Sequence, residues 1–275
     1  MASKLRGSPE HFRSFSMGMS RPVIPDTLSE IFSETYANKV AGLGDTAIVE
    51  MLPANSPSSP PLRQEMFSSP VIPLLYERVL PPVWAAGLRV GGMDEEFAEV
   101  SSFLQGDGGG TVLDLSCGTG FIARRLAASR QFQHVIALDY STEMLQQLIS
   151  ELQQQRRGWN PPALSAGALS LVRGDAGNLP LRAESVDAVH WGAAMHCVPD
   201  AEAGLREAMR VLRPGGKLYA TTFLRPLPDL VFRFFTLPEL EAMAYAAGFG
   251  RGDGAVVEVR RLGPVYGVLR VVKGR

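Results

Sequence analysis

The chain has 275 residues, with 27 Lys and Arg against 28 Asp and Glu, which leaves a net charge of −1. The length predicts one large domain with an appendage, and no run of Lys and Arg indicates nucleic acid or anionic membrane as the main partner. No apolar stretch reaches the roughly 18–20 residues of a transmembrane helix, so any membrane contact is expected to be peripheral, and two cysteines are too few for a disulfide framework or a metal site.

The N-terminal third of the chain differs in kind from the rest. Residues 1–25 contain four basic residues, five serines and one acid, a composition typical of a short organellar transit segment and equally of a disordered basic tail. A helix is predicted over 26–41, and a Pro- and Ser-rich linker follows at 53–61. Residues 62–90 mix apolar and aromatic side chains with prolines, which fits either a lid over a site or simple packing against a sheet. We therefore treat 26–93 as an N-terminal extension that contains a candidate lid.

From residue 94 onward, helical and strand patterns alternate, which is typical of a parallel sheet with helices on both faces. Helices are predicted over 94–105, 120–129, 141–155, 201–212 and 237–247, and strands over 111–115, 134–138, 169–173, 186–190 and 217–223. Two last strands, over 255–262 and 265–272, are joined by a short turn and must be antiparallel. The expected fold is therefore α/β: a Rossmann-like, doubly wound, mostly parallel seven-stranded sheet with an antiparallel C-terminal hairpin, plus an N-terminal helical or irregular cap.

The stretch from residue 111 to residue 140 carries the strongest functional signal. Its first strand ends in a loop of small residues, Ser116-Cys117-Gly118-Thr119-Gly120, a helix follows, and the second strand ends at Asp139. This order is typical of a nucleotide-binding βαβ unit, in which glycines let a ligand approach the backbone and the helix N-terminus offers free N–H groups. Asp139, about 20 residues beyond the loop, is placed to accept hydrogen bonds from ribose hydroxyls.

The kind of nucleotide depends on Asp114. The run from Gly118 to Ala123 satisfies the G-x-G-x-x-G/A pattern of dinucleotide sites, which is a weak signal by itself. A carboxylate four residues before Gly118 faces a pyrophosphate unfavourably, whereas it suits a ligand that carries an ammonium group and no phosphate, such as S-adenosylmethionine. Three alternatives stay open here: an Asp114 that only caps the turn, an NAD-dependent oxidoreductase with the same loop, and a non-catalytic cofactor-binding protein that works through a partner.

Further segments give a more specific interpretation. The run that begins at Asp114 resembles the first motif of class I S-adenosylmethionine-dependent methyltransferases, with Ser116 where that family prefers glycine. The motifs of the third, fourth and fifth strands in that family resemble residues 171–180, 185–190 and 211–218. The run 187–197, with 75–78 and 94–97 upstream, is similar to a group of plant and algal plastid methyltransferases that are related to those of quinone biosynthesis.

The resemblance implies S-adenosylmethionine as the cofactor, a plastid location, and methyl transfer to a quinone-like or lipid-derived acceptor by a methyltransferase domain at residues 94–275. The apolar character of the candidate lid favours a small, hydrophobic acceptor. The resemblance does not imply which acceptor is methylated, at which atom, or in which oligomeric state. No metal is expected.

The resemblance and the strand order together define the expected site. The residues expected to bind the cofactor are Asp114, Ser116, Cys117, Gly118, Gly120, Asp139, Tyr140, Met144, Asp175, Ala176 and His190. Of these, Tyr140 and Met144 are expected to cover one face of the adenine, and Asp175 and Ala176 to bind its amino edge. His196, which follows the fourth strand, is the candidate catalytic base, and a histidine that only hydrogen-bonds its loop fits the sequence at least as well.

Overall fold

The computed structural model describes residues 30–32, 48–52, 92–105, 109–158, 169–225 and 232–275. The transit or tail segment, the linker and the candidate lid lie outside these residues. Of the helix predicted over 26–41, the described part is limited to residues 30–32, the first two of which are helical.

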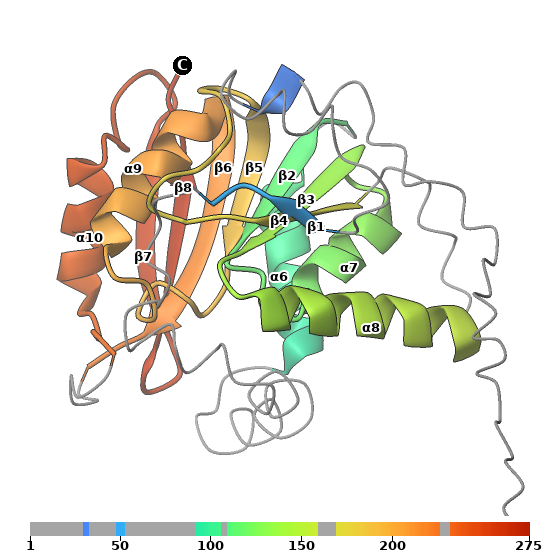
Figure 1. Ribbon diagram of the computed structural model, residues 1–275. Coiled ribbons are helices and arrows are strands. Elements are labelled where there is room, and N and C mark those ends of the chain that lie inside the picture. Colours follow the sequence, from blue (N-terminus) through green and yellow to red (C-terminus); the bar gives the residue numbers. More distant parts are fainter. Residues whose placement is uncertain (1–29, 33–47, 53–91, 106–108, 159–168, 226–231) are drawn as a thin grey trace, which may run out of the picture.

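The core of the described residues is one sheet of eight strands in the order β1-β4-β3-β2-β5-β6-β8-β7 (Figure 1). The strands are β1 (Ile48–Glu50), β2 (Thr111–Leu115), β3 (His134–Asp139), β4 (Leu169–Arg173), β5 (Val186–Trp191), β6 (Leu212–Phe223), β7 (Val256–Leu262) and β8 (Tyr266–Val272). Neighbouring strands from β1 to β6 are parallel, whereas β8 is antiparallel to both β6 and β7. The predicted fold class is confirmed, and the sheet has one strand more than the sequence pattern predicted.

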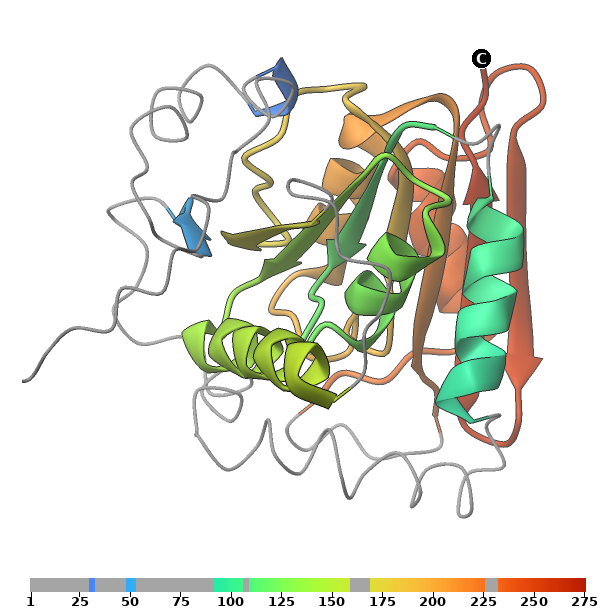
Figure 2. The ribbon, with the colours of Figure 1, turned by 90° about the vertical axis from the view of Figure 1, so that its right-hand side faces the viewer.

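Helices cover both faces of this sheet. The described helices are α6 (Met93–Leu104), α7 (Phe121–Ser129), α8 (Thr142–Gly158), α9 (Ala201–Val211) and α10 (Leu237–Ala246). α6, α7 and α8 lie on one face, and α9 and α10 lie on the other (Figure 2). All five side chains of the central strand β2 are buried. Val112 packs in the hydrophobic cluster on the face covered by α6 and α7, and Leu113 packs in the cluster on the face covered by α9 and α10. Because β2 is buried on both faces, it needs a cover on both, and the three-layer arrangement follows.

Capping residues set the starts of the two helices on the second face. Asp200 caps α9, because its carboxylate accepts a hydrogen bond from the Ala203 N–H at 2.8 Å. Thr236 and Glu239 form a capping box at the start of α10, in which each side chain accepts from the backbone N–H of the other residue. Both helices lie within one residue of the predicted bounds.

The additional strand comes from the N-terminal extension. β1 pairs in parallel with β4 at the edge of the sheet, and Met51 continues the pairing by donating its N–H to the carbonyl of Arg173 at 2.9 Å. Phe32 is fully buried, and its carbonyl accepts a hydrogen bond from Arg182 Nε at 2.7 Å. The sequence pattern gives no signal for β1, because three residues are fewer than the four over which alternation can be recognised. The extension is therefore partly built into the core of the domain.

Two N-terminal truncations are expected to differ sharply in stability. A protein that begins at residue 26 keeps β1, Phe32 and Met51 and should fold like the full chain, because residues 1–25 lack the composition of a core. A protein that begins at residue 53 loses these buried groups and leaves the edge of β4 unpaired, so its free energy of unfolding should fall by about 3–5 kcal/mol or more. Urea unfolding followed by circular dichroism measures both values. Equal stability of the two truncated proteins would contradict a structural role for β1.

Candidate cofactor site

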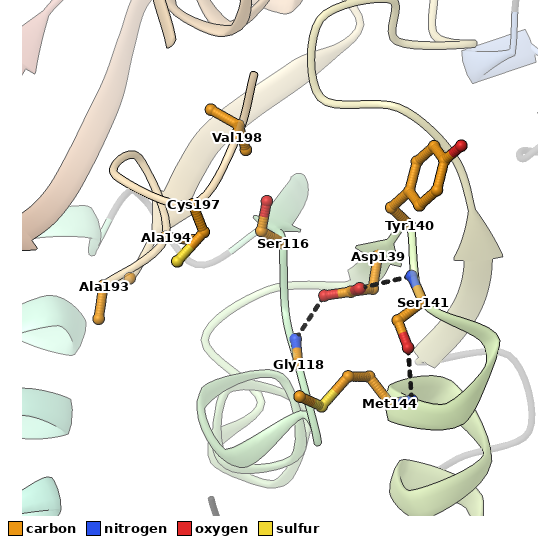
Figure 3. A pocket seen from close by; sticks show the side chains of 11 residues that line it. Ser116, Gly118, Asp139, Tyr140, Ser141, Met144, Ala193, Ala194, Cys197 and Val198 are labelled. Carbon is orange, nitrogen blue, oxygen red and sulfur yellow. Dashed lines mark hydrogen bonds between the residues drawn. The ribbon is translucent and has the colours of Figure 1, made fainter. Parts of the chain in front are cut away.

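A pocket opens at the carboxyl ends of β2, β3 and β5 (Figure 3). β3 and β5 lie on opposite sides of β2, so this is the switch point at which open α/β sheets bind ligands. The pocket has a volume of about 590 Å³, a figure that includes its open mouth. It is lined by Ser116, Gly118, Asp139, Tyr140, Ser141, Met144, Gly192, Ala193, Ala194, Cys197 and Val198. Segments that follow three different strands thus build one site.

The loop after β2 forms one wall of the pocket, and its two glycines, Gly118 and Gly120, have different structural roles. Both have positive φ, +56° at Gly118 and +74° at Gly120, which favours glycine over other residues. A Cβ on Gly118 would meet no atom within 4 Å, so this glycine keeps the pocket wall open. A Cβ on Gly120 would lie 2.2 Å from the Leu148 side chain, so this second glycine is required for the packing of α8. The sequence predicted room for the ligand at both positions; space is open beside Gly118, and a ligand contact at either glycine stays a prediction.

Asp139 ends β3 and points at the loop after β2 (Figure 3). Its Oδ2 accepts a hydrogen bond from the Gly118 N–H, and its Oδ1 accepts one from the Ser141 N–H, each at 2.8 Å. Burial raises the pKa of Asp139 to about 6; these backbone hydrogen bonds oppose the increase, and the charge of Asp114 adds to it. At neutral pH the carboxylate is therefore charged and poorly hydrated, a state in which further donors such as hydroxyls bind it strongly.

Ser116 adopts the left-handed backbone conformation of the glycine that it replaces. Its φ is +55°, a value at which a side chain strains the backbone. Its Oγ accepts a hydrogen bond of 3.2 Å from the indole Nε1–H of Trp191, whose side chain is fully buried. The serine therefore provides an acceptor for a buried donor at the cost of backbone strain. The loop keeps its glycine-like geometry although the sequence departs from the family motif.

Two substitutions at Ser116 should separate these contributions. Ser116→Ala removes the acceptor of the Trp191 indole and keeps the strain, so the free energy of unfolding should fall by about 1–3 kcal/mol. Ser116→Gly also removes the acceptor but relieves the strain, so it should be about 1 kcal/mol more stable than the alanine variant. Urea unfolding of the two variants gives the difference. If alanine proved the more stable replacement, the strain at this position would be refuted.

The predicted adenine residues fall into two groups. Tyr140 and Met144 line the pocket, whereas Asp175 and Ala176 do not. Asp175 follows β4, and its Oδ1 accepts a hydrogen bond from the Gly177 N–H at 2.9 Å, while Ala176 is buried. The contacts of both groups with adenine stay predictions.

Cys117 lies in the loop after β2, outside the lining of the pocket. Burial, followed by the charges of Asp139 and Asp114, raises the pKa of its thiol well above the ordinary value. The thiol is therefore protonated and is not a nucleophile at neutral pH.

Asp114 and His190 form a buried pair, each one residue before the end of its strand. His190 Nδ1 lies 2.7 Å from Asp114 Oδ1, and the two side chains are 4% and 2% exposed, respectively. Asp114 Oδ2 and His190 Nε2 have no hydrogen-bond partner among the described residues. Neither residue lines the pocket, but Gly192, two residues after His190, does. A buried carboxylate with one free acceptor atom fits a ligand that brings a cation, as the ammonium of S-adenosylmethionine does.

His196, the predicted base, lies outside the lining of the pocket, although its neighbour Cys197 is part of it. Its imidazole is 4% exposed and Nδ1 lies 3.3 Å from Thr222 Oγ1. Three aromatic rings enclose it, with centroids 5.0–5.8 Å from its own: Phe223, Phe232 and Phe234. Burial lowers the pKa of His196 to about 3, so the ring is neutral and weakly basic. Its catalytic role stays a prediction, and its surroundings favour the alternative of a structural histidine.

Several residues that line the pocket were not among the site residues expected from the sequence: Ser141, Gly192, Ala193, Ala194, Cys197 and Val198. Ser141 had a usable signal, because it stands at the N-cap position of α8, where its Oγ accepts from the Met144 N–H at 3.1 Å. Ala193 had none. It has a φ of +46°, and its N–H donates to Thr221 Oγ1 at 2.8 Å, a contact with the neighbouring strand that a sequence does not reveal.

Comparison with known sequences finds methyltransferases among the relatives of this chain. An uncharacterized chloroplastic methyltransferase of Arabidopsis thaliana is 39% identical over 189 residues, which are 68% of this chain and 51% of the relative. A ubiquinone/menaquinone biosynthesis C-methyltransferase of Bartonella tribocorum is 33% identical over 144 residues, which are 52% of each chain. The chain thus spans about half the length of the curated relatives that it matches.

Comparison with solved structures gives the same fold. A Haemonchus contortus phosphoethanolamine N-methyltransferase 2 in complex with phosphomonomethylethanolamine and S-adenosylhomocysteine is similar with a TM-score of 0.57 and 17% identity, over 76% of this chain and 60% of that one. Residues 113–220, from the centre of β2 into β6, match the family described as methyltransferase domain. The chain therefore carries a methyltransferase domain at residues 113–220, in a fold shared with solved class I methyltransferases.

Proposed function

We propose that the protein transfers the methyl group of S-adenosylmethionine to a small, hydrophobic acceptor. The observation that carries this proposal is the charge of the pocket. Asp139 is the charged residue among the described lining, and the pair of Asp114 and His190 lies directly behind Gly192. A negative site without a lysine or arginine in its described lining suits a sulfonium and an ammonium, and opposes the pyrophosphate of NAD.

The cofactor supplies an activated methyl group when bound, so the protein needs only to bind, orient and exclude water. Asp139 would hold the ribose hydroxyls, and Gly118 would leave room for the adjoining part of the ligand. The segment after β5 forms the opposite wall, where Ala194, Cys197 and Val198 present apolar surface. An acceptor that reaches this wall would meet no charged side chain of the described lining, which supports a hydrophobic acceptor.

The acceptor class is inferred from the relatives. The Bartonella relative is named a ubiquinone/menaquinone biosynthesis C-methyltransferase, and the Arabidopsis relative is named a chloroplastic methyltransferase. We extend this to the present chain as a quinone-like or lipid-derived acceptor in a plastid, with residues 1–25 as the segment that directs import and residues 62–90 as a lid. The catalytic domain would begin at residue 94. No helix among the described residues is long and apolar enough to cross a bilayer, and contact with a lipid-dissolved acceptor would then be peripheral.

A ligand-binding experiment tests the cofactor. S-adenosylhomocysteine at a hundredfold excess over its Kd should add about 2.7 kcal/mol to the free energy of unfolding, and NAD should add nothing. Isothermal titration and a thermal shift assay measure both. A shift with NAD and none with S-adenosylhomocysteine would overturn the proposal.

A labelling experiment tests the transfer and identifies the acceptor. The protein is incubated with methyl-labelled S-adenosylmethionine and a plastid extract, and the labelled product is separated and identified by mass spectrometry. A matched reaction with the Asp139→Ala variant controls for methylation by other proteins of the extract. Label that enters an apolar product only with the unaltered protein supports the proposal, and label in no product contradicts it.

A further inference from the structure

The strand β6 continues beyond the point where its neighbour β5 ends. The last paired residues are Trp191 of β5 and Ala220 of β6. The next residue of β6, Thr221, accepts the N–H of Ala193 through its side-chain Oγ1 at 2.8 Å. A side-chain hydroxyl thus takes the place of a backbone carbonyl as the acceptor for this N–H, at the point where the chain leaves the sheet and enters the wall of the pocket.

Ala193 has a strained backbone conformation in that wall. Its φ of +46° lies in the left-handed region that favours glycine, so the surrounding structure must hold the residue there. Ala193 and Ala194 lie on the side of the pocket opposite Asp139 (Figure 3). Because the N–H of Ala193 is bound by Thr221, the shape of this wall depends on a hydroxyl outside the described lining of the pocket.

The hydroxyl of Thr221 is itself fixed by two further groups. Tyr266 Oη, at the start of β8, lies 2.8 Å from Thr221 Oγ1 and donates its single hydrogen to this oxygen, the nearer of its two acceptors. Thr221 then donates its own hydrogen to Oε1 of Glu96, in the first turn of α6, at 3.4 Å. The hydroxyl accepts two hydrogen bonds and donates one, which is its full capacity. Thr221 and Tyr266 are 1% and 4% exposed, so water does not compete for their bond.

We infer that Thr221, held by Tyr266 and Glu96, is the positioning residue for the wall that the methyl acceptor meets. The inference rests on the proposed function, in which this wall is the segment after β5. None of the three residues belongs to the described lining of the pocket, so they act on the acceptor through Ala193. Methyl transfer is sensitive to such support, because a misplacement of about 1 Å can cost a factor of about 10² in rate. Binding of the cofactor depends on the opposite side of the pocket and stays unchanged.

Two neighbouring threonines provide a matched pair of variants. Thr221→Val removes the hydroxyl that binds Ala193, whereas Thr221→Ser keeps it. Thr222→Val is the control, because its hydroxyl is also 1% exposed but lies 3.3 Å from His196 Nδ1, on the other face of β6. Ala193→Gly, added to Thr221→Val, removes the strain itself, since glycine adopts a positive φ freely. Should Thr221→Val not fold, Tyr266→Phe replaces it, because it removes one hydrogen bond to the same hydroxyl, and its rate should fall about threefold or more.

The rate of methyl transfer and the affinity for S-adenosylhomocysteine are measured for each variant. The rate is followed with saturating methyl-labelled S-adenosylmethionine and the apolar fraction of a plastid extract, taken into organic solvent so that it holds no active enzyme. Thr221→Val should lose about tenfold or more in rate, while the Kd of S-adenosylhomocysteine stays within about threefold. Thr221→Ser and Thr222→Val should both keep their rates within about threefold. The added Ala193→Gly should raise the rate of Thr221→Val by about threefold or more.

Hydrogen exchange of the Ala193 amide tests the structural link without a methyl acceptor. The amide should exchange faster in Thr221→Val than in the unaltered protein, and at the same rate in Thr222→Val. The inference is refuted if Thr221→Val, or Tyr266→Phe in its place, keeps the full rate of methyl transfer. It is also refuted if Thr222→Val loses as much rate as Thr221→Val, or if the added glycine restores none of it. Binding of S-adenosylhomocysteine with no methyl transfer by the unaltered protein would instead refute the proposed function, and the acceptor wall with it.

Discussion

Lowering the pH from 7 to 5 is expected to weaken the binding of S-adenosylhomocysteine about tenfold. The physical reason is Asp139, whose pKa of about 6 in the ligand-free protein means that the ribose-binding carboxylate is mostly protonated at pH 5. A protonated carboxyl loses its charge and one of its acceptor sites, and each further pH unit costs another factor of ten. Isothermal titration at several pH values measures the dependence.

The Asp139→Ala variant is the control for this pH dependence. It should bind at least tenfold more weakly at pH 7, since hydrogen bonds to a charged group are worth about 1.5–3 kcal/mol each. Its affinity should also stop changing between pH 7 and pH 5. If the variant kept the pH dependence of the unaltered protein, another group would be responsible, and the assignment of Asp139 to the ribose would lose its support.

Replacing His196 by phenylalanine is expected to make the fold more stable toward acid than that of the unaltered protein. The pKa of His196 is about 3 in the folded protein and near 6.5 when unfolded, so the unfolded chain takes up this proton first as the pH falls. The stability that the neutral imidazole contributes is complete above pH 6.5 and is lost progressively toward pH 3, by about 3 kcal/mol between pH 6.5 and pH 4. Urea unfolding over this range should show the free energy of unfolding of His196→Phe rising by about 3 kcal/mol relative to that of the unaltered protein.

Asp139 acts in the opposite direction over part of this range. Its pKa is raised from 3.8 to about 6, so its contribution to stability is complete below pH 3.8 and is lost as the pH rises through 6. The two effects partly cancel in the unaltered protein and must be separated by variants. The difference between Asp139→Ala and the unaltered protein gives the contribution of Asp139, and the difference between His196→Phe and the unaltered protein gives that of His196.

The same His196→Phe variant decides whether this histidine is catalytic. We expect its rate of methyl transfer to stay within tenfold of the unaltered protein, because a ring with a pKa of about 3 among three phenylalanines is a poor base. A general base would instead contribute about 10²–10⁴-fold. A loss of that size at unchanged cofactor affinity would restore the catalytic assignment that the sequence suggested.

Most of the sheet could be predicted because its strands are long enough to show a pattern and are separated by clear helical periods. Two features of the sheet, β1 and the start of β6, could not be predicted. β1 has three residues, and its partner β4 is remote in the sequence. β6 begins at Leu212, five residues before the predicted strand, because Pro214 and the two following glycines read as a turn. In the structure Leu212 is paired with Val186, and an irregularity in the pairing follows.

The positions of the site residues followed from one rule, that ligands bind beyond the carboxyl ends of parallel strands. That rule correctly brought Gly118 and Asp139 to a common pocket. It could not reveal the pairing of Asp114 with His190, because this depends on which strands are neighbours and on their register. The rule also could not predict the conformation of Ser116, because the Trp191 indole that donates to its hydroxyl lies 75 residues away in the sequence.

The parallel pairing of β1 with β4 has a consequence for the order in which the protein folds. Glu50 of β1 and Arg173 of β4 form an ion pair across 123 residues of chain. During synthesis this edge of the sheet cannot form until β4 has left the ribosome, and closing so long a loop is slow compared with local pairing such as the β7–β8 hairpin. We therefore expect β1 to dock late, onto a sheet that is already assembled. Until β4 is available, β1 has no neighbouring strand to pair with and its backbone groups stay exposed to solvent.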